Sequence, residues 1–298
     1  MELTLSAAQL ESARKELLAD DSSMLIDLMF CLNLHLSTNE VPARIWRKAT
    51  ALGWVDPQSR TVTNLGGLVA DTTREYKFWL ERGRLLHAER DYSLLAAEGY
   101  SGKTVLEVGS GFGCNLLSLS LYPGRFLGIE PVALYRQLTS IFAEREGLPC
   151  PNIIDGSGEH IPLDKNTVDV VLCYSTHQYM DVRRALLEMS RVLKPGGQLR
   201  IMGGTFGQYF FEEIQRIAQL KRARELPTYA LTIINTLFYE GFGRRLYIPG
   251  GYSATTAPIY PSVAAMCRWL NRAGLVYRAD LSRCLPGDMC FIADRPLV

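Results

Sequence analysis

The sequence lacks the features that mark secreted, membrane-spanning and metal-stapled proteins. No apolar run reaches the ~18–20 residues that a membrane helix needs, and residues 1–21 contain no basic stretch followed by an apolar one, as a signal peptide would. The seven cysteines are scattered and include no Cys-x-x-Cys pair, a spacing that favours reduced thiols over disulfides or a zinc site. We therefore expect a cytoplasmic protein without a bound metal.

The sequence also lacks an excess of either charge. Its 298 residues include 32 Lys and Arg and 31 Asp and Glu, a net charge of +1. Nucleic acids and anionic membrane surfaces both favour a strong basic excess, so neither is predicted as a partner. The hydrophobic fraction of 47% is enough for a substantial core, and the length suggests one large domain or two modest ones.

The first hundred residues are predicted to be mostly helical. Ser37-Thr38-Asn39-Glu40 has the form of a capping box, and Pro42 is expected just inside the helix that follows it. The predicted elements are helices at residues 6–18, 24–36, about 42–53 and 64–84, with a short β-hairpin at residues 54–63. This order resembles a winged helix, and residues 51–70 resemble its last helix turn and wing.

The charge of this region argues against DNA binding. Residues 1–100 hold 11 basic and 14 acidic residues, a net charge of −3, whereas phosphate contacts need a positive face. We therefore favour a dimerisation or substrate-covering role for a helical domain at residues 1–95.

From residue 101 onward, apolar runs of strand length alternate with helical patterns. The predicted strands are residues 103–108, 125–130, 152–155, 168–174, 198–202, 276–283 and 288–293, the last two joined by a turn at Pro286-Gly287. Such alternation predicts an α/β fold, a doubly wound and mostly parallel seven-stranded sheet with helices on both faces. We place this domain at residues 96–298, with a long insertion at about 205–261.

The strongest chemical signal is the segment 105–113, Val-Leu-Glu-Val-Gly-Ser-Gly-Phe-Gly, in which an apolar strand runs into a glycine-rich turn. A lone glycine pattern of this kind fits many nucleotide-binding folds. Here Glu107 stands two residues before the first glycine, where it would repel the pyrophosphate of a dinucleotide but would suit a cationic ligand. The motif therefore favours a ligand that carries a sulfonium or an amino group.

Three further motifs follow in order. Glu130 ends the next predicted strand, 23 residues after Glu107, where a carboxylate can accept hydrogen bonds from a ribose diol. Residues 155–163 form a polar loop before the strand at 168–174, and residues 185–197 end in Lys-Pro-Gly-Gly.

Together the four motifs resemble the class I S-adenosylmethionine-dependent methyltransferases, in the small-molecule branch called UbiE-like or type 11. The resemblance covers roughly residues 100–204 and the two closing strands. It implies a Rossmann-like methyltransferase fold with S-adenosylmethionine as the cofactor.

The resemblance assigns a role to each motif residue. Glu107, Gly109, Gly111 and Gly113 would hold the methionine part of the cofactor, and Glu130 would bind the ribose hydroxyls. Ser157 and Gly158 would meet the adenine; the family commonly has an aspartate in place of Ser157, so Asp155 is an alternative acceptor. The neighbouring residues that complete the predicted cofactor site are Ser110, Pro131, Glu159 and Tyr174.

The acceptor side is less defined by the sequence. In the resembled family, the segment 173–181 faces the methyl group that is transferred, and His177 is its candidate general base, or else a lining residue. The insertion is rich in aromatic residues that could form an apolar lid, face a cationic substrate or simply fill the core. Tyr252 and Tyr260 lie in a loop of Gly, Ser and Thr and are the candidate pocket residues. Tyr76 and Trp79 either close over the cofactor or pack in the hydrophobic core.

We therefore predict an enzyme that transfers a methyl group from S-adenosylmethionine to an O, N, S or C atom of a small molecule. Two alternatives stay open: a cofactor-sensing winged-helix regulator with an inactive methyltransferase-like domain, and a transferase that uses the same cofactor for another reaction. A homodimer through the N-terminal region is expected by analogy with O-methyltransferases. The sequence does not fix the acceptor, the use of a base or the oligomeric state.

Overall fold

The computed structural model describes residues 4–87, 89, 96–219, 226–245, 258–285 and 288–297. The strands are β1 (Thr104–Val108), β2 (Arg125–Ile129), β3 (Asn152–Ile154), β4 (Val168–Tyr174), β5 (Leu193–Gly203), β6 (Val276–Tyr277), β7 (Arg283–Leu285) and β8 (Asp288–Asp294). The helices are α1 (Ala7–Leu18), α2 (Ser22–Asn33), α3 (Ala43–Ala51), α4 (Asn64–Glu81), α5 (Cys114–Leu119), α6 (Ala133–Glu146), α7 (Val182–Val192), α8 (Phe206–Gln219), α9 (Leu226–Phe242) and α10 (Val263–Arg272). Two short 3₁₀ helices are η2 (Ala97–Tyr100) and η3 (His177–Tyr179).

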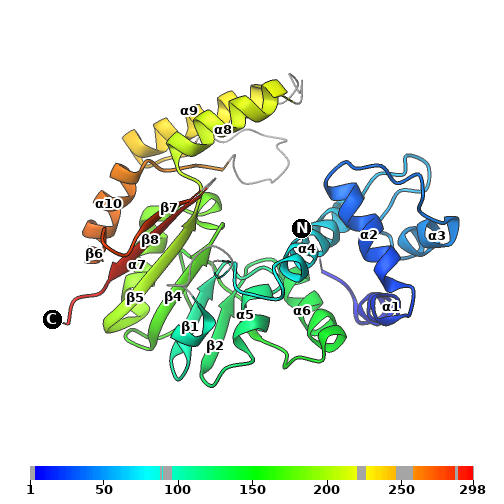
Figure 1. Cartoon of the computed structure of the whole chain (residues 1–298), viewed down its shortest axis with the longest axis horizontal. Helices are drawn as coiled ribbons and strands as arrows, with labels where there is room; N and C mark the ends of the chain where they lie inside the picture. The colour runs from blue at the N-terminus through cyan, green and yellow to red at the C-terminus, as the bar shows by residue number, and fades with distance from the viewer. Residues whose placement is uncertain are drawn as a thin grey trace. The chain divides into compact units, whose positions relative to one another are not determined.

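The strands form one sheet in the order β3-β2-β1-β4-β5-β8-β6, with β7 beside β8 (Figure 1). β2 pairs in parallel with β3, and β4 pairs in parallel with both β1 and β5. β8 runs antiparallel to β5, β6 and β7. The predicted doubly wound, mostly parallel sheet is therefore confirmed, and its switch point lies between β1 and β4, where such sheets bind ligands beyond the carboxyl ends of the strands.

The prediction of seven strands is wrong by one among the residues that the structure describes. The expected strand at 276–283 breaks into β6 and β7, because Leu281 and Ser282 donate backbone N–H groups to the carbonyl of Arg278 and form a turn. The turn expected at Pro286-Gly287 lies outside the described residues.

The predicted capping box at Ser37 is also wrong. α3 begins after Pro42, which is its N-cap and not its first residue, and no side chain caps the helix. The capping box of this region belongs to α1 instead: Ser6 Oγ accepts from the Gln9 backbone N–H at 3.3 Å, and Gln9 Oε1 accepts from the Ser6 backbone N–H at 2.9 Å. Pro42 already fixes the backbone at the start of α3.

The hairpin expected at residues 54–63 is a tight turn closed by a single antiparallel bridge between Val55 and Val62. Within it, the Asp56 carboxylate accepts the backbone N–H groups of Gln58 (3.0 Å) and Ser59 (2.7 Å). The order of helices and hairpin is as expected, and the winged-helix and dimer assignments stay predictions.

Contacts divide the chain into two compact units, and the domain boundary expected between residues 95 and 96 stays a prediction. Unit 1 comprises residues 1–102 and 110–155, and unit 2 comprises residues 103–109 and 156–298.

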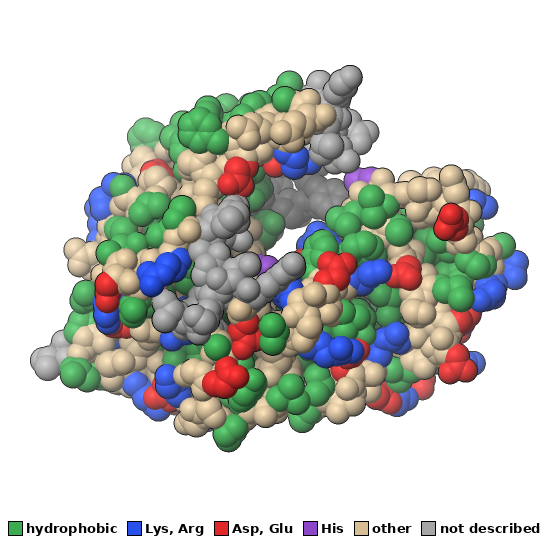
Figure 2. All heavy atoms as spheres, viewed as in Figure 1, with side chains coloured by type: hydrophobic (Ala, Val, Ile, Leu, Met, Phe, Trp, Pro, Cys, Tyr) green, Lys and Arg blue, Asp and Glu red, His purple; other side chains and the backbone are tan. Residues whose placement is uncertain are grey.

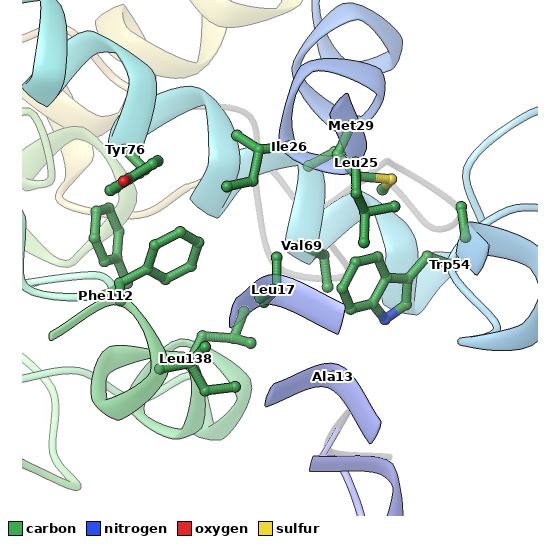
Figure 3. Close-up of a cluster of buried hydrophobic side chains, with 14 of the residues drawn as sticks. Ala13, Leu17, Leu25, Ile26, Met29, Trp54, Val69, Tyr76, Phe112 and Leu138 are labelled. Carbon is green, nitrogen blue, oxygen red and sulfur yellow. The ribbon is translucent and has the colours of Figure 1, made fainter. Parts of the chain in front are cut away.

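Unit 1 has one hydrophobic core that joins the N-terminal helices to α5 and α6. Figure 3 shows Leu17 of α1 beside Leu138 of α6, and Tyr76 of α4 beside Phe112. Tyr76 and Trp79 are both buried, and Trp79 Nε1 donates to Ser118 Oγ at 2.8 Å, so both residues belong to this core.

Polar groups reinforce the same packing. The Arg145 guanidinium of α6 donates to the Leu17 carbonyl at 2.7 Å and to Ser22 Oγ at 2.6 Å. The side-chain amide of Gln137 bonds the backbone of Leu5 through both its N and its O atom, each at 2.8 Å. The N-terminal helices are thus part of the packing of α6.

Unit 2 contains the strands β1, β4, β5, β6, β7 and β8. α7 and α10 pack against each other and against β5 and β6, while α8 and α9 lie side by side beyond the end of β5 (Figure 1). Figure 2 shows hydrophobic side chains on the outside of this helix pair. Its exposed apolar residues are Phe210, Phe211, Leu226, Ile234, Leu237 and Phe242.

Candidate cofactor and acceptor sites

The turn after β1 requires glycine at its first position. Gly109 has φ +72°, and a Cβ placed there would lie 2.7 Å from the Cβ and Oγ1 atoms of Thr176. Thr176 is itself fixed, since its hydroxyl donates to the Val108 carbonyl at 3.0 Å. Both the backbone conformation and the close packing therefore exclude a side chain.

Glu107 and Tyr174 lie in unit 2, near the carboxyl ends of the paired strands β1 and β4. Glu107 is 3% exposed and Tyr174 is 5% exposed. Glu107 stands opposite Leu172 in the β1–β4 pairing. Burying a carboxylate costs free energy unless charge or hydrogen bonds compensate it, so this position is unusual for an ordinary core strand.

Glu130 follows β2 in unit 1 and is buried. Its two carboxylate oxygens accept backbone N–H groups, one from Gly111 and one from Val132, each at 2.9 Å. Burial raises the pKa of Glu130, and these two N–H groups together with the charge of Arg136 lower it in part. The acid is thus fixed in orientation and has lone pairs left for a diol.

The rest of the glycine-rich loop also lies in unit 1. Ser110 Oγ is buried and has no hydrogen-bond partner among the described residues. Gly113 begins α5 with φ +87°, and a Cβ there would lie 2.8 Å from Ile153 Cδ1. Gly111, at φ +56°, has open space where a side chain would start. The loop therefore offers a buried hydroxyl and an open backbone position.

The loop at residues 157–160 is closed by a bridge between Ser157 and His160. Gly158 packs so closely that a Cβ would lie 2.5 Å from Met180 Sδ. Glu159 accepts the Asp181 backbone N–H at 2.6 Å at the start of α7, which gives it a structural partner. The predicted cofactor roles of these loop residues stay predictions.

Two other sequence candidates lie in unit 1. Pro131 is exposed directly after Glu130. Asp155, the alternative adenine acceptor, has a side chain that is 75% exposed and forms an ion pair with Arg136 at 3.0 Å. Its exposed carboxylate keeps most of its acceptor capacity.

A pocket of about 210 Å³ opens in unit 2 beyond β4 and β5. Its lining residues are Ser175, Gln178, Gly204, Tyr209, Glu212, Glu213 and Tyr260. Ser175 has φ +55°, a conformation that costs free energy for a residue other than glycine and that often occurs at functional sites. We take this pocket as the candidate acceptor site.

Gln178 and the two tyrosines define the pocket wall. Gln178 is 7% exposed, and its Oε1 has no hydrogen-bond partner among the described residues. The rings of Tyr209 and Tyr260 stack with centroids 4.2 Å apart and an interplanar angle of 10°. Sequence reasoning named Tyr260 but missed Gln178, although Gln178 lies in the segment 173–181 that it singled out.

His177, the candidate base, lies behind this wall. It is 1% exposed and packs against Gly203 so closely that a side chain on Gly203 would collide with its ring. Burial lowers the pKa of His177 to about 4, with a smaller lowering from the charge of Arg245 and a partial offset from the Gly204 backbone. A base is most effective near the working pH, so this position favours a structural or lining role.

Tyr252, the remaining acceptor-side candidate, lies outside the described residues. Among the described residues, no group of His, Cys, Asp and Glu side chains could hold a metal ion. None of the described helices is both long enough and apolar enough to span a bilayer.

The residues around the first two motifs suit a methionine-derived nucleoside. Within unit 1, the unpartnered Ser110 hydroxyl can bond a polar ligand and Glu130 can accept from a diol. Comparison with known proteins gives the same result, since residues 106–201 match the model of a family described as a methyltransferase domain. This segment is a methyltransferase domain.

The methyltransferase domain also has curated relatives. An uncharacterized methyltransferase of Bacillus subtilis, YcgJ, is 30% identical over 107 residues, which are 36% of this chain and 42% of that protein. A phthiotriol/phenolphthiotriol dimycocerosates methyltransferase of Mycobacterium ulcerans is 37% identical over 102 residues, which are 33% of this chain and 36% of that protein. The chain thus spans less than half the length of these relatives.

A solved S-adenosylmethionine-dependent methyltransferase from Methanosarcina mazei has 15% identity and a TM-score of 0.49, covering 70% of this chain and 99% of that one. The family match confirms the resemblance read from the motifs, and the cofactor of this domain family is S-adenosylmethionine.

Proposed function

We propose that this protein transfers a methyl group from S-adenosylmethionine to a small-molecule acceptor bound in the pocket beyond β4 and β5. The observation that carries the proposal is Glu130, a buried acid after β2 that two backbone N–H groups hold in a fixed orientation inside a matched methyltransferase domain. A fixed carboxylate at this position can recognise a ribose diol.

In the proposed site, Glu107 and the loop at residues 109–113 hold the methionine part of the cofactor, and Glu130 holds the ribose. Ser157, or Asp155 in its place, accepts a hydrogen bond from the adenine amino group. When bound, the cofactor supplies a methyl group on a positively charged sulfur, which is already activated for transfer. The remaining task of the chain is to align the acceptor and exclude water.

The pocket residues perform that task in this proposal. Gln178 and the stacked pair Tyr209 and Tyr260 orient the acceptor. His177 supports the wall and is not given a base role, because its ring is buried and burial lowers its pKa to about 4, which makes it a weak proton acceptor. An acceptor that needs deprotonation would then lose its proton to solvent or to a pocket carboxylate.

Calorimetry with S-adenosylhomocysteine tests the cofactor assignment. We expect saturable binding to the wild type and binding about tenfold to a hundredfold weaker to Glu130→Gln, since hydrogen bonds to a charged group contribute ~1.5–3 kcal/mol. Asp164→Asn removes an exposed acid of unit 2 and is the matched control, expected to bind like the wild type. Equal binding by Glu130→Gln would remove the ribose assignment.

A turnover assay then tests the reaction. Incubation with S-adenosylmethionine and candidate acceptors should release S-adenosylhomocysteine together with a product heavier by one methyl group. Release of any other cofactor fragment would favour a different transferase reaction.

A further inference from the structure

The helix α9 of unit 2 has the reverse polarity of an ordinary surface helix. Its innermost side chains are polar, since Thr232, Asn235 and Thr236 are at most 1% exposed. Its apolar side chains Ile234 and Leu237 are instead more than half exposed. A surface helix of a globular protein normally buries its apolar stripe and exposes its polar one. The outward side of α9 is therefore suited to apolar surroundings and not to water.

Hydrogen bonds hold α9 in this orientation. Tyr239 Oη donates to Asp181 Oδ1 at 2.6 Å, and Thr236 Oγ1 accepts the Tyr260 backbone N–H at 3.1 Å. Closer to the start of the helix, Tyr229 Oη donates to a backbone carbonyl of α8 at 2.8 Å. Rotating α9 to bury its apolar side chains would break these bonds, so the reversed polarity belongs to the packed fold.

The neighbouring helix α8 adds to the exposed apolar surface. α8 and α9 lie side by side, and Figure 2 shows hydrophobic side chains gathered on the outside of the pair. We call this surface the outer face, and its residues are Phe210, Phe211, Leu226, Ile234, Leu237 and Phe242. Apolar side chains gathered in this way mark a site of contact with a membrane or another molecule.

The part of the outer face on α9 offers few groups that could bond a protein partner. The one charged residue in the sequence of α9, Glu240, accepts the backbone N–H and the hydroxyl of Ser262 at 2.6 and 3.1 Å. Among the exposed residues of α9, a helix that the structure describes throughout, only Thr228 has a polar side chain. Protein interfaces carry a polar rim and about one hydrogen bond per 100–200 Å². This composition therefore favours hydrocarbon over a protein surface.

Basic residues accompany the outer face. Arg244 is exposed two residues after Phe242, which is the last residue of α9. In the sequence, the six residues that link α8 to α9 contain three basic residues and one acid. Anionic headgroups attract basic residues that lie near a membrane surface. The charge beside the outer face thus complements an anionic bilayer.

We propose that the outer face docks on the surface of a lipid bilayer. The apolar side chains of α8 and α9 enter the boundary between headgroups and acyl chains, and Arg244 meets anionic headgroups. The helices lie on the membrane and do not cross it, in keeping with the lack of a described helix that could span a bilayer. The net charge of the whole chain, +1, gave no sign of this surface, because apolar docking needs no overall basic excess.

Sedimentation with vesicles tests the docking. The full chain is mixed with sucrose-loaded vesicles made of equal parts of phosphatidylcholine and phosphatidylglycerol, at low and at high salt. We expect the wild type to sediment with the vesicles and to remain partly bound at high salt, because salt screens the contribution of charge but not that of apolar burial. A protein that stays in the supernatant, or that salt releases completely, would overturn the proposal.

Two leucines provide a matched pair of variants. Leu237 of α9 and Leu187 of α7 are each 55% exposed. Leu237→Ser should weaken vesicle binding about tenfold, whereas Leu187→Ser should bind like the wild type. Thermal melts report whether each variant is folded. Equal losses in the two variants, or no loss in a folded Leu237→Ser, would contradict the assignment of the outer face.

Two further variants separate apolar docking from charge. Phe242→Ser should weaken binding about tenfold at both salt concentrations, because it removes apolar surface. Arg244→Gln should weaken binding about fivefold at low salt and much less at high salt. If neither folded variant differs from the wild type, the end of α9 does not meet the bilayer and the proposed orientation is wrong.

A second copy of the chain is the other candidate occupant of the outer face. Analytical ultracentrifugation without lipid distinguishes the two. A dimer that Leu237→Ser dissociates, together with no binding to vesicles, would assign the face to contact between copies and overturn the proposal. The docking does not depend on methyl transfer: vesicle binding without binding of S-adenosylhomocysteine would support the docking and remove the proposed reaction.

Discussion

Two regions lie outside the matched methyltransferase segment, the N-terminal helices and the insertion, and they bury their large side chains to different degrees. The N-terminal region, α1 to α4, buries its large side chains: Trp54, Trp79 and Leu25 are all fully buried in unit 1. The insertion, α8 and α9, leaves Phe211, Leu237 and Phe242 more than half exposed in unit 2. The difference indicates that the first region stabilises the fold, whereas the second builds a surface and the pocket beneath it.

The largest expected effect is a core substitution in the N-terminal region. Trp79→Ala removes a fully buried ring and its bond to Ser118, and should lower the free energy of unfolding by about 3–5 kcal/mol. Urea denaturation measures it, with Trp79→Phe as the milder control. A loss below about 1 kcal/mol would mean that these helices do not share the core of α6.

The next contrast compares one arginine from each region. Arg145→Met removes the hydrogen bonds from α6 to Leu17 and Ser22 and should cost about 2–3 kcal/mol. Arg216→Met removes a half-exposed pair with Glu213 within α8 and should cost about 0.5 kcal/mol or less. Equal costs in urea denaturation would erase the proposed difference between the regions.

Urea denaturation at a series of pH values tests whether His177 is buried. Since burial lowers its folded-state pKa from 6.5 to about 4, the unfolded chain takes up a proton first as the pH falls. The stability that this residue contributes is therefore complete above pH 6.5 and is lost as the pH falls towards about 4. Between pH 7 and pH 5 the wild type should lose on the order of 2 kcal/mol more than His177→Asn.

The exposed His160 provides the control for that series. His160→Asn should follow the wild-type dependence on pH, as measured by urea denaturation at each pH. If His177→Asn and the wild type lose stability in parallel, the imidazole is not buried as described.

The smallest effect is expected on the outer face of the insertion. Phe242→Ser replaces a side chain that is 72% exposed at the end of α9 and should change the free energy of unfolding by less than about 0.5 kcal/mol. A thermal melt checks this. A loss of several degrees would show that this face is packed in solution, against a second copy or another part of the chain.

The prediction of β1 to β4 from sequence was close because buried parallel strands carry continuous apolar runs. Val168–Tyr174 was predicted with the bounds that β4 has, and β1, β2 and β3 differ by one residue at one end. The glycine-rich turn could be predicted for the same local reason, since its conformation needs glycine at positive φ. The capping box failed because a pattern of four residues competes with proline and with the packing around it.

The sequence by itself determined the strand and helix segments, the order of the motifs and hence the methyltransferase domain, because these depend on local periodicity and turn chemistry. Only the tertiary structure decided that the N-terminal helices share a core with α6, that Glu159 bonds the start of α7 and that Gln178 meets two tyrosines at one pocket. Those contacts join residues tens of positions apart, and which side chains meet depends on packing that no local pattern encodes.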